Sequence, residues 1–309
     1  MKRIILVILI IGFSWNLSAQ NNDKQVYLFS YFKDNGKDGL HLAYSYDGLS
    51  WIALNNDQSV LKPEVAKDKL MRDPCIIRGG DGNFHMVWTV SWTDKVIGYA
   101  SSKDLIHWSE QVAIPVMAHE DGARNCWAPE ITYDPVKKSY MIYWATTITG
   151  QFQETASEKE NGYNHRIYYT LTKDFKKFSK TKLLYNPGFN VIDATIIKDG
   201  KRFVMFAKDE TREPIQKNIK IAYSKKINGP YSPASAAITG NYWAEGPTIL
   251  KKDNQWTVYF DKYTLHQYGA ISSSDLVTWK DISDQIHLPK GIRHGSILMI
   301  SEEELKRLY

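Results

Sequence analysis

Five short motifs recur along this chain, and their spacing is the feature that most constrains its fold. Successive motifs lie roughly 50 to 65 residues apart, a period typical of propeller blades or solenoid units. The motifs are Arg72-Asp73-Pro74, Cys126-Trp127-Ala128-Pro129-Glu130, Ile192-Asp193-Ala194, Ala244-Glu245-Gly246-Pro247 and Arg293-His294-Gly295-Ser296. Each motif introduces an apolar segment with the length of a strand, so the chain is predicted to repeat one strand-rich unit.

A second pattern, Ser/Thr-x-Asp-x-x-x-aromatic, falls between these motifs. Its copies occupy 45–51, 102–108, 172–178 and 273–279, and a degenerate copy at 224–231 has Lys226 in place of the Asp. Each copy follows an alternating segment, so we interpret it as a strand, a turn held by the Asp side chain and an outer strand packed by its aromatic residue. The Asp residues of this pattern are therefore predicted to form turns and not to take part in catalysis.

The strand content of each unit predicts an all-β fold, a five-bladed β-propeller. A motif, its apolar strand, a turn and further strands make about four strands per unit, which is the content of a propeller blade. The last motif, at His294, has no outer strands after it, and the first outer pattern, at Trp51, has no motif before it. We expect the two ends of the chain to join in a fifth blade, with its inner strand from the C-terminus, because this closure leaves no open edge.

The first 19 residues have the features of a signal peptide. Lys2 and Arg3 precede the apolar stretch 4–13, and Ala19 is a small residue suited to cleavage. The apolar stretch is short for a bilayer span, and a retained anchor is the alternative. The predicted domains are a cleaved signal peptide at 1–19 and a single propeller at 20–309, exported to a bacterial periplasm or outside the cell.

Composition argues against several classes of function. The formal net charge is +5 and the basic residues are scattered, which does not favour nucleic acid as a partner. The sequence contains no glycine-rich phosphate loop and no Cys/His metal cluster. The two cysteines, Cys75 and Cys126, are predicted to be buried free thiols because their offsets from the motifs differ in parity, with a disulfide as the alternative.

Taken in order, the five motifs resemble those of glycoside hydrolase family 43, and the resemblance covers essentially all of 20–309. It implies a five-bladed propeller with a central pocket that hydrolyses O-glycosyl bonds by single displacement, with inversion and with no required cofactor. It also implies an oligosaccharide or polysaccharide as the partner. We expect a monomer that does not span a membrane.

Three carboxylates carry the implied chemistry. The resemblance assigns Asp73 as the general base, Glu245 as the general acid and Asp193 as the carboxylate that tunes and orients the acid. Inner strands of a propeller converge on its axis, so acids from three blades lie near each other with room for a water, and a third carboxylate raises the pKa of the acid. The alternative is that Asp73 and Asp193 cap turns while Glu245 pairs with Arg293. This chain has Ala194 where the family usually has Pro after the third acid, a change that affects the turn more than the carboxylate.

Other residues are predicted to line the pocket. The resemblance implies that His294 lies near the ring axis as a substrate contact, where the family often holds a structural calcium ion through water. Trp92 and Trp127 are candidates for stacking on a sugar, with core packing as the alternative. Arg293 is expected to bind a sugar hydroxyl and the base, and the polar segment 151–165 is a lid, a pocket wall or a solvated loop. The ends of the second strands share this face, at 88–92, 144–147, 207–210 and 260–263.

The identity of the sugar does not follow from the fold, because the resembling family includes several specificities on one scaffold. Our expectation is an exo-acting α-L-arabinofuranosidase that removes terminal pentoses from plant polysaccharide side chains. A β-xylosidase and a galactofuranosidase or galactosidase are alternatives on the same scaffold. An alternative of another class is a sugar-binding propeller without catalysis.

Overall fold

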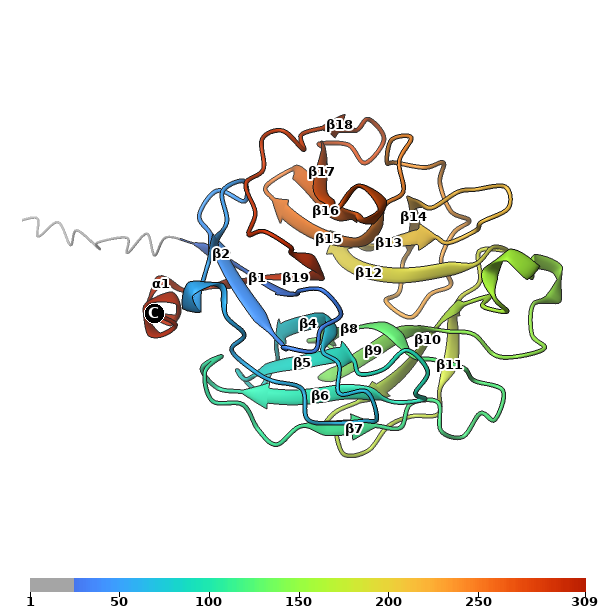
Figure 1. Ribbon diagram of the computed structural model, residues 1–309, viewed down its shortest axis with the longest axis horizontal. Helices are drawn as coiled ribbons and strands as arrows, with labels where there is room; N and C mark the ends of the chain where they lie inside the picture. Colours follow the sequence, from blue (N-terminus) through green and yellow to red (C-terminus); the bar gives the residue numbers. More distant parts are fainter. Residues whose placement is uncertain (1–24) are drawn as a thin grey trace, which may run out of the picture.

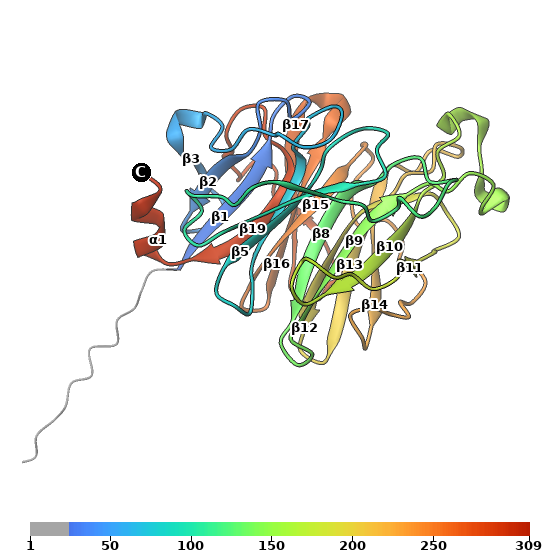
Figure 2. The same cartoon turned by 90° about the horizontal axis from the view of Figure 1, so that it is seen from below.

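The computed structural model describes residues 25–309, so the predicted signal peptide lies outside the described part of the chain. In the described part, five sheets surround a common centre, four of them with four strands and one with three (Figure 1). The view turned by 90° shows the strands of neighbouring sheets running steeply through the thickness of the ring (Figure 2). The predicted all-β, five-bladed propeller is confirmed.

The five blades follow one another along the chain. Blade 1 contains β4 (Arg72–Arg78), β5 (Phe84–Thr89), β6 (Ile97–Ser102) and β7 (Val112–Ile114). Blade 2 contains β8 (Trp127–Asp134), β9 (Ser139–Thr146), β10 (Arg166–Thr172) and β11 (Lys182–Tyr185). Blade 3 contains β12 (Val191–Asp199), β13 (Arg202–Asp209) and β14 (Asn218–Ser224). Blade 4 contains β15 (Glu245–Lys252), β16 (Gln255–Lys262), β17 (Gln267–Ser273) and β18 (Lys280–Asp281).

Blade 5 joins the two ends of the described chain, as predicted. Its strands are β19 (Arg293–Ile300), β1 (Val26–Phe32), β2 (His41–Ser45) and β3 (Ile52–Ala53). β19 and β1 are antiparallel, with Val26 opposite Ile300 and Ser30 opposite Ser296. The short helices are η1 (Asn55–Asp57), η2 (Gln153–Thr155), η3 (Glu158–Glu160), η4 (Tyr263–Leu265) and the C-terminal α1 (Glu302–Arg307).

The Ser/Thr-x-Asp pattern forms turns in the predicted way. In the first copy, Asp47 Oδ1 accepts hydrogen bonds from the backbone N–H groups of Leu49 and Ser50, at 2.7 and 2.8 Å. Asp104, Asp174 and Asp275 make the same pair of backbone contacts in their own copies. These side chains satisfy backbone donors that the tight turn leaves unpaired, which explains the recurrence of the pattern.

Blade 3 has three strands, one fewer than the unit predicted from the sequence. Its outer segment follows the degenerate copy, in which Lys226 replaces the turn-forming Asp. The backbone N–H groups of Ser232, Ser235 and Ile238 still reach carbonyls of β14, at Tyr223, Ile221 and Ile219 respectively. The donors are three residues apart in the outer segment, whereas the acceptors are two residues apart in β14, so no regular ladder forms.

The blade starts share one backbone distortion, which places the site. The strand register is interrupted after the first residue of β4, β8 and β15 and after the second residue of β12, and the residue at each interruption has a positive φ. These residues are Asp73 (51°), Ala128 (44°), Asp193 (52°) and Gly246 (61°). Such bulges re-aim side chains beside functional sites. Only glycine fits at 246, because a Cβ there would lie 2.5 Å from His294 Cγ.

The hydrophobic interior is formed by side chains of neighbouring blades. The hydrophobic clusters lie between adjacent blades; Trp144 and Ile131 of blade 2, for example, pack with Val87 of blade 1.

Cys75 and Cys126 are buried and free, which confirms the prediction of two free thiols. Within residues 25–309, no helix has the length and apolar character needed to cross a membrane.

Candidate active site

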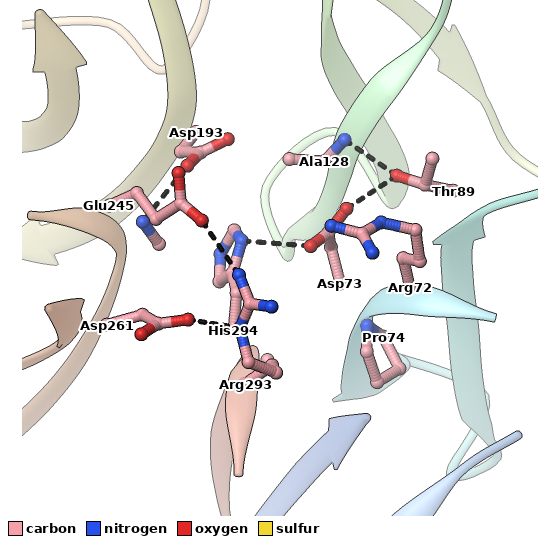
Figure 3. Close-up of polar contacts among 12 residues, drawn as sticks. Arg72, Asp73, Pro74, Thr89, Ala128, Asp193, Glu245, Asp261, Arg293 and His294 are labelled. Atoms are coloured by element: carbon pink, nitrogen blue, oxygen red, sulfur yellow. Dashed lines mark hydrogen bonds and ion pairs between the residues drawn. The ribbon is translucent and has the colours of Figure 1, made fainter. Parts of the chain in front are cut away.

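The predicted base, Asp73, lies at the centre of the ring between two blades (Figure 3). Its Oδ2 accepts a 2.8 Å hydrogen bond from Thr89 Oγ1, and its Oδ1 lies 3.3 Å from His294 Nδ1. Burial disfavours the charged carboxylate, but the hydrogen bond from His294 and the charges of His294 and Arg72 outweigh it, so the pKa of Asp73 is lowered. An ionised carboxylate in this position can accept a proton from water.

Thr89 connects the base to the neighbouring blade, and sequence reasoning gave it no role. Its Oγ1 donates to Asp73 and accepts a 2.8 Å hydrogen bond from the backbone N–H of Ala128. Ala128 occupies the bulge position of blade 2, where blades 1 and 3 have an Asp. The threonine therefore fixes the base relative to a blade that contributes no carboxylate at this position.

The predicted acid, Glu245, lies across the centre from Asp73 (Figure 3). Lys208 Nζ lies 2.8 Å from Glu245 Oε2, and Arg293 Nη2 lies 3.1 Å from Oε1. The Glu245 side chain is 21% exposed, whereas that of Lys208 is 1% exposed. Both oxygens of Glu245 thus contact cations, so a ligand that approaches this carboxyl group competes with Lys208 or Arg293.

Asp193 lies beside the acid, as predicted. Its Oδ2 accepts a 3.0 Å hydrogen bond from the backbone N–H of Gly246, the residue after Glu245. Burial, and then the nearby Glu245 charge, raises the pKa of Asp193 to about 6, against a lowering by His294. Asp193 therefore both fixes the backbone at the start of β15 and adds negative charge close to the acid above about pH 6.

Arg293 contacts the acid side of the site. It was expected to bind the base, but its ion pairs are with Glu245 and with Asp261, the latter through Nε. Asp261 is buried, and burial followed by the Glu245 charge raises its pKa to about 6 despite Arg293. The Arg293–Glu245 pair that the non-catalytic alternative predicted is present. Glu245 nevertheless faces the same centre as Asp73 (Figure 3).

A chain of buried charges runs from the acid to the segment between β9 and β10. Lys208 Nζ lies 2.6 Å from Glu210, and Lys217 Nζ lies 2.6 Å from the same carboxylate. Lys217 Nζ is also 3.8 Å from Glu160, which lies in η3. The segment 151–165, predicted as a lid, wall or solvated loop, is therefore connected to Glu245 by alternating charges.

The two predicted stacking residues lie together at the rim. Trp127 Nε1 donates a 3.0 Å hydrogen bond to the Trp92 carbonyl, and the two rings are perpendicular with centroids 5.6 Å apart. The Trp92 ring is 42% exposed and is covered on one face by Arg72, whose guanidinium carbon lies 4.3 Å from its centroid. Trp127 packs against Tyr163 of the 151–165 segment, with centroids 4.8 Å apart.

Glu130, the last residue of the second motif, lies beneath the site. Tyr143 donates a 2.7 Å hydrogen bond to it and accepts one of 3.0 Å from the backbone N–H of Ile196 in β12. Burial raises the pKa of Glu130 to about 7. Because Ile196 follows Asp193 by three residues, this contact fixes the strand that carries Asp193.

His294 is placed near the centre as predicted, but its surroundings do not fit direct calcium ligation. Its Nδ1 faces Asp73, and although burial lowers its pKa, the hydrogen bond that it donates to Asp73 and the charge of Asp193 raise the pKa to about 9. An imidazolium donates protons and repels cations. Among residues 25–309, no group of three or more His, Cys, Asp or Glu side chains is arranged to hold a metal ion.

Three site residues to which the sequence analysis gave no individual role occupy equivalent positions on the second strands of their blades. Thr89 lies opposite Arg72, Lys208 opposite Ile192, and Asp261 opposite Glu245 in the strand registers. Each lies at or next to the end of a second strand, opposite the residue that precedes the positive-φ position of its motif. The sequence signal was the polar residue at the end of three of the second strands.

A family profile and one curated relative match this chain. A family profile described as a probable glycosyl hydrolase domain, related to glycoside hydrolase family 43, matches residues 22–306. An α-L-arabinofuranosidase of Bifidobacterium longum subsp. longum is 24% identical over 248 residues, which make up 68% of this chain and 23% of that protein. The chain therefore spans about a quarter of the length of this curated relative.

Solved structures share the fold at low identity. The α-L-arabinofuranosidase of Lactobacillus brevis superimposes with a TM-score of 0.51 at 20% identity, over 69% of this chain and 72% of that one. The exo-β-1,3-galactanase of Phanerochaete chrysosporium, in a structure with galactose, gives a TM-score of 0.54 at 13% identity, over 72% and 53% of the two chains.

Proposed function

The chain belongs to the glycosidase family related to glycoside hydrolase family 43, and we propose that it is an inverting, exo-acting enzyme that releases a terminal α-L-arabinofuranose. The observation that carries this proposal is the contrast between Asp73 and Glu245. Asp73 is stabilised as a carboxylate by His294, and Glu245 faces it from another blade with Asp193 beside it. Two carboxyl groups in unlike surroundings suit a base and an acid.

The proposed reaction is a single displacement. Asp73 takes a proton from a water as that water attacks the anomeric carbon, and Glu245 gives a proton to the glycosidic oxygen as the bond to the leaving group breaks. Asp193 places a carboxyl group beside Glu245 and fixes the backbone at Gly246. Arg293 and Lys208 bind Glu245 before the substrate arrives, and Arg293 is then available to a sugar hydroxyl.

The choice of arabinofuranose rests on the names of two similar proteins. The curated relative is named as an arabinofuranosidase, and one structural neighbour has the same name, whereas another is a galactanase. Exo action is favoured because ion pairs connect the 151–165 segment to Glu245 and Tyr163 of this segment packs on Trp127, which would let the segment act as a wall of the pocket. Xylose, galactofuranose and galactose are the other candidate sugars. A calcium ion held through water near His294, a monomeric state and export after cleavage at Ala19 remain predictions.

A panel of aryl glycosides tests the proposal. Purified protein is assayed on 4-nitrophenyl α-L-arabinofuranoside, β-D-xyloside, β-D-galactofuranoside and β-D-galactopyranoside, with Asp73→Asn as the control. We expect turnover of the arabinofuranoside, lost by at least about 1,000-fold in Asp73→Asn because no group accepts the water proton. If only the xyloside or one galactoside is turned over, the sugar of that substrate replaces arabinofuranose in the proposal. Sugar binding without turnover of any substrate would support the non-catalytic alternative.

A further inference from the structure

A cavity of about 650 Å³ opens between blades 4 and 5, beside the candidate active site. Three segments line it: the β1–β2 connection at Asp34, the β16–β17 connection that contains η4, and the segment 283–292 that leads into β19. These segments lie on the face of the ring that carries the site, because β15 and β19 both begin there, at Glu245 and Arg293.

The cavity and the active site share a wall. Asp261 and Arg293 line the cavity, and they are paired with each other. Arg293 also contacts Glu245 Oε1 at 3.1 Å, so a single side chain separates the cavity from the acid. Figure 3 shows Asp261 and Glu245 on one side of the centre and Asp73 on the other.

This location matches the leaving-group side of the proposed reaction. In a single displacement, the attacking water and its base lie on one side of the anomeric carbon, and the departing oxygen and its acid lie on the other. A sugar attached through the departing oxygen therefore begins next to Glu245 and extends away from Asp73. The cavity beyond Arg293 lies in that direction.

The lining of the cavity suits a neutral polar ligand. Its charged side chains include both signs, with Asp34 and Asp284 balanced by Lys262 and Lys290. Such a balance gives no net attraction to an anion or a cation. Side chains that donate and accept hydrogen bonds lie beside the rings of two tyrosines, a combination that orients sugar hydroxyls and covers sugar C–H faces. These residues are His266, Gln267, Tyr263 and Tyr268.

We propose that this cavity is the subsite for the leaving-group sugar, a neutral pentose or hexose unit of the glycan from which the terminal residue is removed. The proposal rests on the proposed glycosidase function. It assigns substrate recognition to the β16–β17 connection and to 283–292. Neither segment contains one of the three carboxylates, which lie in β4, β12 and β15. The enzyme would then favour a glycan over a simple aryl glycoside.

Paired substrates test the subsite. The double variant His266→Ala/Gln267→Ala and the variant Lys290→Ala are assayed with an aryl glycoside and with an oligosaccharide that carries the same terminal sugar. We expect the ratio of kcat/KM for the oligosaccharide to kcat/KM for the aryl glycoside to fall at least about tenfold, since each lost hydrogen bond to sugar weakens binding. His107→Ala is the matched control, because His107 is 84% exposed on an outer turn of blade 1. It should keep the wild-type ratio.

Two outcomes separate this proposal from the proposed function. An unchanged ratio in the cavity variants, with normal turnover by the wild type, overturns the subsite and leaves the glycosidase intact. If the wild type turns over no substrate, the proposed function fails, and calorimetric binding of the same oligosaccharide decides the subsite separately. Binding that His266→Ala/Gln267→Ala weakens at least about tenfold supports it, and equal binding by wild type and variant overturns it.

Discussion

Lys208 and Glu245 form an ion pair in which the lysine side chain is almost wholly buried and the carboxylate faces the centre of the ring. The Nζ–Oε2 distance is 2.8 Å, and the lysine is 1% exposed. Although burial acts to lower it, the charges of Glu245 and Glu210 raise the pKa of Lys208 well above its usual range. The lysine thus remains charged, so it both holds Glu245 in place and keeps a positive charge beside the carboxyl group.

Replacing Lys208 by Met tests this dual role. Removal of the cation leaves Glu245 and Glu210 near each other, so we expect a loss of roughly 3 kcal/mol in the free energy of unfolding. The alkaline limb of the pH–rate profile should move to higher pH, because a nearby cation favours the ionised form of a carboxyl group.

Lys220→Met is the control for Lys208→Met. Lys220 belongs to the same blade, but it pairs with Asp209, at 2.7 Å. It should leave the alkaline limb where the wild type has it. An unmoved alkaline limb in Lys208→Met would show that the lysine has only a structural role.

Thr89→Val tests how the base is held. The valine has a similar shape, but it leaves an oxygen of Asp73 and the backbone N–H of Ala128 without their partner. Unsatisfied buried groups cost about 1–3 kcal/mol each. We expect lower stability in urea unfolding and a kcat reduced by about tenfold or more, with KM changed little. Thr89→Ser keeps the hydroxyl and should restore most of the kcat; equal losses in Ser and Val variants would contradict the role of the hydroxyl.

Glu245→Gln tests the assignment of the acid. A dinitrophenyl leaving group needs little protonation, whereas a sugar alcohol needs much, so the variant should lose far more activity on an oligosaccharide than on a dinitrophenyl glycoside. The difference between the two losses should be about 100-fold or more. Equal losses on both substrates would remove Glu245 from the role of acid.

Asp193→Asn separates the tuning residue from the acid. The variant keeps Glu245 but removes the charge beside it, so the alkaline limb should move to lower pH, opposite to the shift expected for Lys208→Met. Measuring both variants in the same buffers checks the two signs together. Shifts in the same direction would contradict the electrostatic account of the site.

His294 predicts how stability depends on pH. Its pKa is about 9 in the folded protein, against an ordinary value of 6.5. The stabilisation from its pairing with Asp73 is therefore complete below pH 6.5 and is lost as the pH rises from 6.5 to 9, by about 3 kcal/mol in total. Asp193, with its pKa raised to about 6, changes stability only at lower pH. Urea unfolding should show this decline in the wild type and a nearly flat profile in His294→Gln.

The sequence predicted the blades because the turn chemistry of each unit is local. Asp47 and its equivalents form hydrogen bonds within three residues of themselves, so their pattern is visible without the fold. The closure by β19 and β1 followed from the incomplete units at the two ends. Blade 3 differed because the spacing of its outer segment against β14 depends on residues that the repeat does not constrain.

The site was only half visible in the sequence. Asp73, Asp193 and Glu245 were found because each lies in a motif. Thr89, Lys208 and Asp261 fell within the segments predicted to line the pocket but were given no roles of their own, because those roles come from cross-strand register and from contacts between blades. The motifs are also less equivalent than they look, since Glu245 precedes the bulge position that Asp73 and Asp193 occupy. This offset explains why the acid, unlike the base, reaches Lys208 and Arg293.

The stereochemistry of the released sugar tests the central claim most directly. If Asp73 acts as a base and not as a nucleophile, water attacks the anomeric carbon directly and its configuration is inverted. The reaction is followed by time-resolved proton NMR with enough enzyme to release sugar faster than it mutarotates. We predict that the anomer of inverted configuration appears first and that the other anomer grows in only with mutarotation. First appearance of the retained anomer would show a covalent intermediate and contradict the assignment of Asp73 as a base.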